Sequence, residues 1–178
     1  FTRAGHVEHG ADLSSAIDLG LQLVDRLRQW TSGLAEAFSE PTIVDDVPYF
    51  VNLGMIEGGA WRSSMPASAC MGIRIGFPRG WTADQCESEL RRLIHDFARE
   101  RKLAHPPEVK LTGFRAHGYM LSAEHRLARD LAAAHRAAHG TDPVAFALAS
   151  TADARIYVEG FGVPAICYGA VAHDIHGV

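Results

Sequence analysis

The sequence predicts an α+β domain built on an antiparallel sheet, followed by a smaller α/β segment. In residues 1–121, two stretches with apolar residues every three to four positions alternate with short β-rich stretches. After residue 121 the composition becomes Ala-rich, and short apolar stretches alternate with helical ones. The first pattern is typical of an antiparallel sheet with helices on one face, and the second of a parallel sheet covered on both faces.

Length and composition are those of an ordinary globular protein. The chain has 178 residues, of which 47% are hydrophobic and 21% charged. The formal net charge of −4, without a Lys/Arg cluster, argues against a nucleic-acid partner. No apolar run approaches the roughly 20 residues that span a bilayer, so we expect no membrane partner either. The three scattered cysteines lack metal-type spacing and predict reduced thiols in a cytoplasmic protein.

The first domain is expected to begin with a helix over residues 12–31, which Asp12 could cap and Gly33 would follow. A β-rich stretch covers residues 42–53 and is closed by a turn at residues 57–59.

A second strand is expected over residues 67–77, and Thr82 is an expected N-cap for a helix to about Arg101. Residues 109–114 would form another strand. With a first strand largely cut off by the chain start, the order βαββαβ predicts a ferredoxin-like arrangement.

The second segment is expected to contain a helix over residues 123–139, with Gly140 as its C-cap. A buried strand at 144–149, a short helix at 153–159 and a strand at 165–168 would follow. We place the domain boundary near residue 121, which gives domains 1–121 and 122–178.

Ten histidines are candidates for metal binding or catalysis. His135 and His139 are four residues apart, so they could bind a metal from one helix face or simply form a solvated face. His6 and His9 share a Gly-flanked turn. Four isolated histidines are interpreted as surface or structural residues: His95, His105, His117 and His125.

His173 and His176 follow the strand at 165–168, in the kind of loop where an open α/β sheet places its site residues. There an imidazole could bind zinc, but spacing alone leaves a metal role open.

Thr151 and Arg155 lie after the strand at 144–149, where a hydroxyl, helix-start N–H groups and a guanidinium can hold a carboxylate. The alternative is that Thr151 only caps a helix and Arg155 pairs with a surface acid. Arg74 lies in an apolar strand, so it either meets an anionic partner or extends its head into solvent.

Four segments, in order, resemble the family of dinuclear zinc aminoacylases, acetylornithine deacetylases and succinyl-diaminopimelate desuccinylases. RAGHVEHGADLSSAI resembles the lid motif with a central His, and VNLGMIEGGAWRSSMPASACMGIRIG resembles the paired strands of the lid. STADARIYVEGFGVPAICYG resembles a stretch of the catalytic domain, and AHDIHGV resembles the last metal-ligand motif. The resemblance implies a lid domain followed by the C-terminal part of a three-layer αβα zinc-peptidase-like domain.

The resemblance also implies roles for individual residues. His6 would donate a hydrogen bond to the oxyanion in the partner subunit's active site. His176 would bind one of two zinc ions, for which cobalt may substitute. Thr151 and Arg155 would hold the α-carboxylate of an N-acyl amino acid or peptide substrate. Two lid domains would pair in a homodimer.

Two positions depart from the family pattern: Ser63 and Ser64 stand where Asn is common, and Gly76 stands where the lid arginine is usual. A shift of two residues keeps the strand face, so Arg74 could replace that arginine. The other metal ligands and the general base of the family precede the lid, so we expect this chain to be an inactive fragment of the full-length enzyme. The alternatives are a non-catalytic dimerisation module and a homologue that has lost its metals.

Overall fold

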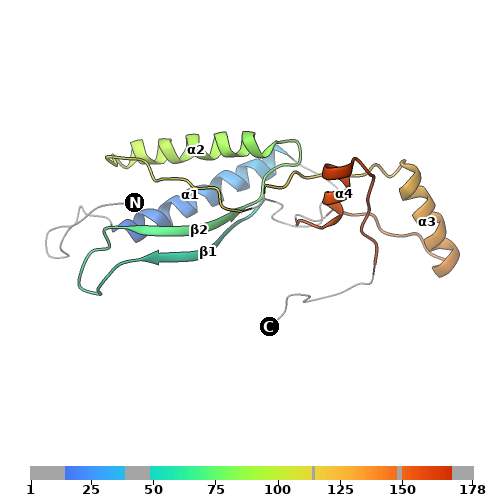
Figure 1. Cartoon of the computed structure of the whole chain (residues 1–178), viewed down its shortest axis with the longest axis horizontal. Helices are drawn as coiled ribbons and strands as arrows, with labels where there is room; N and C mark the ends of the chain where they lie inside the picture. Colours follow the sequence, from blue (N-terminus) through green and yellow to red (C-terminus); the bar gives the residue numbers. More distant parts are fainter. Residues whose placement is uncertain (1–14, 39–48, 114, 148–149, 170–178) are drawn as a thin grey trace.

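The computed structural model describes residues 15–38, 49–113, 115–147 and 150–169 (Figure 1). Two long helices, α1 and α2, lie over a two-stranded hairpin, whereas two shorter helices, α3 and α4, lie towards the other end of an elongated molecule (Figure 1). None of the helices in these residues is long and apolar enough to cross a membrane. The architecture is therefore mixed α and β, as predicted.

Helix α1 spans Ala16–Ala37 and starts later and ends later than predicted. Ser15 is its N-cap, because the Ser15 hydroxyl accepts a hydrogen bond from the Asp18 N–H at 3.0 Å. Asp12, the expected cap, lies outside the described residues. The helix continues through Gly33 to bury Leu34, which is 8% exposed, and this burial offsets the cost of about 1 kcal/mol that an interior glycine carries.

Strands β1 (Val51–Gly58) and β2 (Ala69–Ile75) form an antiparallel hairpin, with Val51 opposite Ile75 and Gly58 opposite Ala69. The β2 prediction is confirmed. Of the stretch expected at 42–53, residues 42–48 lie outside the described residues, and β1 begins at Val51 and extends beyond the expected end to Gly58. Pairing continues through the expected turn to Gly58, and the chain turns only at Gly59, whose φ of 78° favours glycine.

Helix α2 spans Ala83–Glu100, and the predicted cap at Thr82 is confirmed. The Thr82 hydroxyl accepts from the Gln85 N–H, and the Gln85 side chain accepts from the Thr82 N–H, which is a complete capping box.

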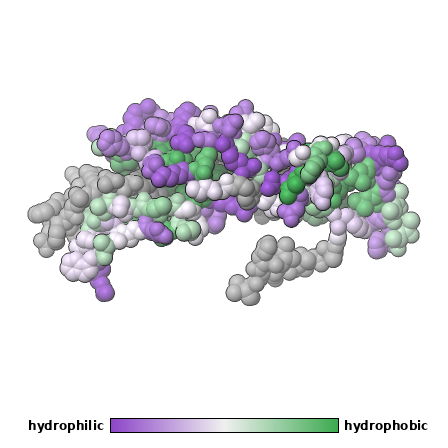
Figure 2. All heavy atoms as spheres, viewed as in Figure 1, coloured by the Kyte–Doolittle hydropathy of each residue, from purple (hydrophilic) through white to green (hydrophobic). Residues whose placement is uncertain are grey.

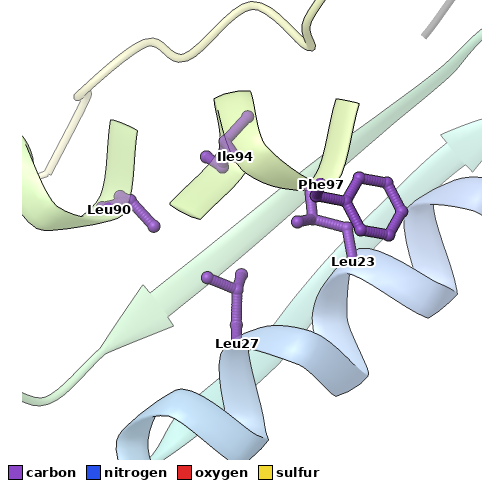
Figure 3. Packing of buried hydrophobic residues seen from close by; sticks show 5 residues of the cluster. All are labelled: Leu23, Leu27, Leu90, Ile94 and Phe97. Atoms are coloured by element: carbon purple, nitrogen blue, oxygen red, sulfur yellow. The ribbon is translucent and has the colours of Figure 1, made fainter. Parts of the chain in front are cut away.

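The core lies between the two long helices and one face of the hairpin (Figure 3). Partly buried Val51, Ile73 and Ile75 of the strands pack against this cluster, so both helices cover the same face. The buried residues of the cluster are Leu23, Leu27, Leu90, Ile94 and Phe97.

The strand expected at 109–114 is wrong over its described residues, 109–113. Val109 does pack against the core, but its carbonyl accepts a hydrogen bond from the Arg91 guanidinium at 3.4 Å. The Arg91 side chain thus donates the hydrogen bond that a neighbouring strand would otherwise supply to Val109. Leu111 in the same stretch is 46% exposed.

The helices of the second segment are confirmed and its strands are not. Helix α3 spans Arg126–His139 and ends on left-handed Gly140, and helix α4 spans Ala154–Phe161. Residues 144–147 and 165–168 form no strand, apart from one bridge residue at Ala147.

The predicted parallel sheet is therefore wrong in the part of the chain that the structure describes. Parallel strands are stable when helices cover both faces, but neither α3 nor α4 buries any residue. Val144 is accordingly 84% exposed and Phe146 57% exposed.

Candidate functional site

Arg74 and Thr151, 77 positions apart, meet at the hairpin face that the helices leave open. In β2, residues 69, 71, 73 and 75 are partly buried and the alternating residues are exposed, which puts Arg74 on the open face. The Arg74 Nη2 donates a hydrogen bond to the Thr151 hydroxyl at 3.2 Å. The Phe50 ring lies beneath the guanidinium, with its centroid 5.7 Å from Cζ. The structure thus brings together two of the three residues predicted to bind substrate.

Thr151 does not cap α4. The N-cap position is Asp153, which makes no side-chain capping hydrogen bond. The capping alternative for Thr151 is therefore wrong, because its hydroxyl instead accepts the hydrogen bond from Arg74.

Arg155, the third predicted substrate residue, lies in the first turn of α4. Its Nη1 is 3.3 Å from the Glu159 Oε2 one turn later. The expected alternative, in which Arg155 pairs with an acid, therefore describes one of its contacts.

Glu159 and His117 are contacts of this site that sequence reasoning missed. The His117 backbone N–H donates to the Glu159 Oε1 at 3.1 Å, and the His117 Nε2 accepts from the Ala83 N–H at 3.4 Å. The spacing of four between Arg155 and Glu159 was the available signal for their ion pair. Nothing in the spacing indicates that His117 reaches the start of α2.

Besides His117, three of the described histidines make structural contacts: His125, His135 and His139. The His135 Nδ1 lies 2.8 Å from the Tyr168 hydroxyl, and its Nε2 lies 3.4 Å from the Thr141 hydroxyl. The His135 ring centroid is 4.7 Å from that of His139. His125 caps α3, where its Nδ1 accepts from the Leu127 N–H.

The predicted catalytic and metal-binding histidines lie outside the described residues. These are His6, the predicted catalytic residue, and His176, the predicted metal ligand; the further candidates His9 and His173 also lie outside the described residues. Within the described ranges, no group of three or more His, Cys, Asp or Glu side chains could hold a metal ion.

Loss of contact with water raises the pKa of buried Cys86 and of partly exposed Tyr119. Burial raises the pKa of the Cys86 thiol to about 11, against a smaller lowering by Arg115. Burial, followed by the charge of Cys167, raises the pKa of Tyr119.

An open hollow of about 390 Å³ lies beside the start of α2. Its lining includes the carboxylates Asp84 and Glu89 and none of the predicted site residues. Negative charge repels an anionic substrate, so we place the candidate site at Arg74 and Thr151 instead.

Two long helices on one face of an antiparallel hairpin, with Arg74 on the open face, define a small α+β domain. Residues 2–102 match the family described as peptidase dimerisation domain, and this match covers more than half of the 178 residues. The chain belongs to this family. A search of curated proteins found no match.

Proposed function

We propose that this chain supplies the dimerisation domain and part of the catalytic domain of a zinc-dependent amidohydrolase. The parent enzyme would cleave the amide bond of N-acyl amino acids or small peptides, as acetylornithine deacetylases do. The observation that carries this proposal is the family match over residues 2–102. The domain boundary near residue 121 is part of the same proposal.

The contact between Arg74 and Thr151 supports a site for the substrate's α-carboxylate. A guanidinium has five N–H donors in a planar fork that matches a carboxylate with two parallel hydrogen bonds. The Phe50 ring beneath the Arg74 guanidinium and the Thr151 hydroxyl beside it hold that fork in one orientation. A preoriented donor loses less side-chain entropy when the substrate binds. Arg155 would add a second positive charge from α4.

The roles of His6 and His176 rest on the resemblance of their motifs, because both lie outside the described residues. His6 would donate a hydrogen bond to the oxyanion, and His176 would be one metal ligand. Bound zinc, or cobalt in its place, would polarise the amide carbonyl and lower the pKa of bound water. A reducing compartment such as the cytoplasm suits the free thiols of Cys70, Cys86 and Cys167.

The test is hydrolysis of a panel of N-acyl amino acids and dipeptides by the full-length parent with added zinc. We expect activity that a chelator abolishes and zinc or cobalt restores, and that His176→Ala removes. Arg74→Ala should raise the KM for carboxylate substrates roughly tenfold, as loss of a hydrogen bond to a charged group predicts. A parent that binds no metal and cleaves no substrate would overturn the proposal.

A dimerisation module without catalysis is the second candidate. Strand β1 pairs with β2 along one edge, and apolar Met55 and Ile56 on it are 63% and 46% exposed. Leu21 on the adjoining helix α1 is 41% exposed. An exposed strand edge of this kind favours pairing with another chain. This candidate predicts dimers whose formation is independent of metal and of His176.

A further inference from the structure

The carboxylate of Glu159 makes two contacts, one with each oxygen. Its Oε2 lies 3.3 Å from the Arg155 Nη1, and its Oε1 accepts the His117 backbone N–H at 3.1 Å. One side chain therefore connects α4 to a segment 42 residues earlier in the chain.

The ion pair of Arg155 with Glu159 is more buried than the pair with the same spacing on α3. The two side chains are 25% and 30% exposed. In the pair of Arg126 with Asp130 on α3, which has the same spacing of four, the side chains are 86% and 66% exposed. An ion pair shielded from water holds its geometry more firmly than an exposed one.

The segment that Glu159 contacts is itself attached to α2. The His117 imidazole accepts the N–H of Ala83, the first residue of the helix. Arg115 forms ion pairs with Asp84 at 2.6 Å and Glu87 at 3.2 Å on the same helix. A continuous path of contacts thus runs from α2 through His117 and Glu159 to Arg155.

We propose that Glu159 is the positioning residue of the substrate-carboxylate subsite: it orients the Arg155 guanidinium and connects α4 to the lid domain. This rests on the proposed function, in which Arg155 binds the substrate's carboxylate. A guanidinium carries five N–H donors in a planar fork, so a single arginine can contact two carboxylates. Without Glu159 the arginine keeps its charge but loses its fixed orientation.

The substitution Glu159→Gln separates orientation from simple charge. Glutamine has nearly the same size, but its amide has one acceptor oxygen and one donor nitrogen. His117 and Arg155 contact different oxygens of Glu159, so replacing one oxygen by an NH2 donor removes one of the two contacts. If Glu159 only competed with substrate for Arg155, its neutralisation would tighten binding; if it orients Arg155, binding weakens.

The experiment uses the full-length parent with zinc and an N-acetylated amino acid, beside the same compound as its carboxamide. In Glu159→Gln, the KM for the carboxylate should rise roughly 3- to 10-fold, with kcat changed less than about twofold. The KM for the carboxamide should not change. In an Arg155→Ala background, Glu159→Gln should add nothing, because the two residues act as one unit.

Asp130→Asn is the matched control, since it neutralises the acid of an exposed pair on α3 with the same spacing. Its kinetic constants should equal those of the parent, and thermal unfolding of both variants should show that they fold. Calorimetric titration with the N-acetylated amino acid gives the affinity independently of turnover.

The outcomes separate this inference from the proposed function. A KM and affinity for the carboxylate that are unchanged or improved in Glu159→Gln would overturn the positioning role, even if the parent hydrolyses the amide. Weaker binding of the carboxylate alone would support it, even if turnover is absent. A parent that neither binds nor cleaves the compounds would overturn both.

Discussion

Cys86 illustrates how a position on a helix sets the chemistry of one side chain. It lies on the buried side of α2 and is 7% exposed. Burial disfavours the thiolate and raises the thiol pKa to about 11, and the nearby charge of Arg115 only partly opposes this. Cys86 is therefore a weak nucleophile, because little of it is present as thiolate. The thiols of Cys70 and Cys167 differ from it in being exposed to solvent.

The raised pKa of Cys86 predicts a loss of stability at alkaline pH. The unfolded thiol ionises near its ordinary value of 9.0, whereas the folded thiol stays neutral up to about 11. The neutral Cys86 thiol contributes fully to the free energy of unfolding below the pKa of the unfolded state. This contribution, at most about 2–3 kcal/mol, is lost as the pH rises through the pKa of the folded state.

Urea unfolding at pH values on either side of this window measures the effect. The free energy of unfolding of the wild type should fall more steeply with pH than that of Cys86→Ala. Cys70→Ala, at an exposed position, should retain the wild-type slope. Equal slopes for all three proteins would refute the assignment.

At the scale of single elements, local signals located the helices well and the strands poorly. The capping box at Thr82 and the left-handed Gly140 fix helix ends through contacts only a few residues apart. The stretch expected as a strand at 109–114 has suitable residue types, but a strand also needs a neighbouring strand from elsewhere in the chain. The carbonyl of Val109 instead accepts a hydrogen bond from the Arg91 side chain.

Thr82→Ala removes one half of the capping box of α2 and should lower the free energy of unfolding by about 1 kcal/mol. The N–H of Gln85 then loses its acceptor. Ser88→Ala is the control, because the Ser88 hydroxyl only donates to the Asp84 carbonyl inside the same exposed helix face. Denaturant unfolding should show a change within about 0.5 kcal/mol for the control. A similar loss in both variants would mean that the cap contributes nothing specific.

At the scale of the whole molecule, one group of exposed apolar residues lies on α4, away from the packed core. The core joins α1, α2 and the hairpin, whereas Figure 2 shows hydrophobic residues gathered over α4. Phe161 is 72% exposed and Tyr157 57% exposed on that helix. Exposed apolar patches mark surfaces that bind other protein. The exposed apolar residues of α4 therefore mark a surface suited to contact with further protein.

The family assignment predicts a homodimer, which we assign to the free edge of β1 and the adjoining face of α1. The double substitution Leu21→Lys with Met55→Lys places charge on this surface at positions that are 41% and 63% exposed. It should shift the chain from dimer to monomer in sedimentation velocity without unfolding it. Leu111→Lys, at a position 46% exposed outside the hairpin and helices, is the matched control and should stay dimeric. A dimer that survives the double substitution would place the interface elsewhere.

The sequence by itself determined the helices α1 to α4 of the described residues, the strand β2, the family, and the residue types of the candidate site. Helix periodicity, caps and motif order are local, so they can be recognised without knowing the neighbours of each segment. Residues His6 and His176 remain predictions from their motifs.

Only the tertiary structure decided which distant residues meet. The contact of Arg74 with Thr151 depends on the position of Thr151, just before α4, beside the open hairpin face. The contacts of Glu159 with His117 and of His117 with Ala83 likewise join separate elements. The tertiary structure also decided which stretches form strands. Hydrogen bonds between strands need a partner segment, and the residue spacing within one stretch cannot specify that partner.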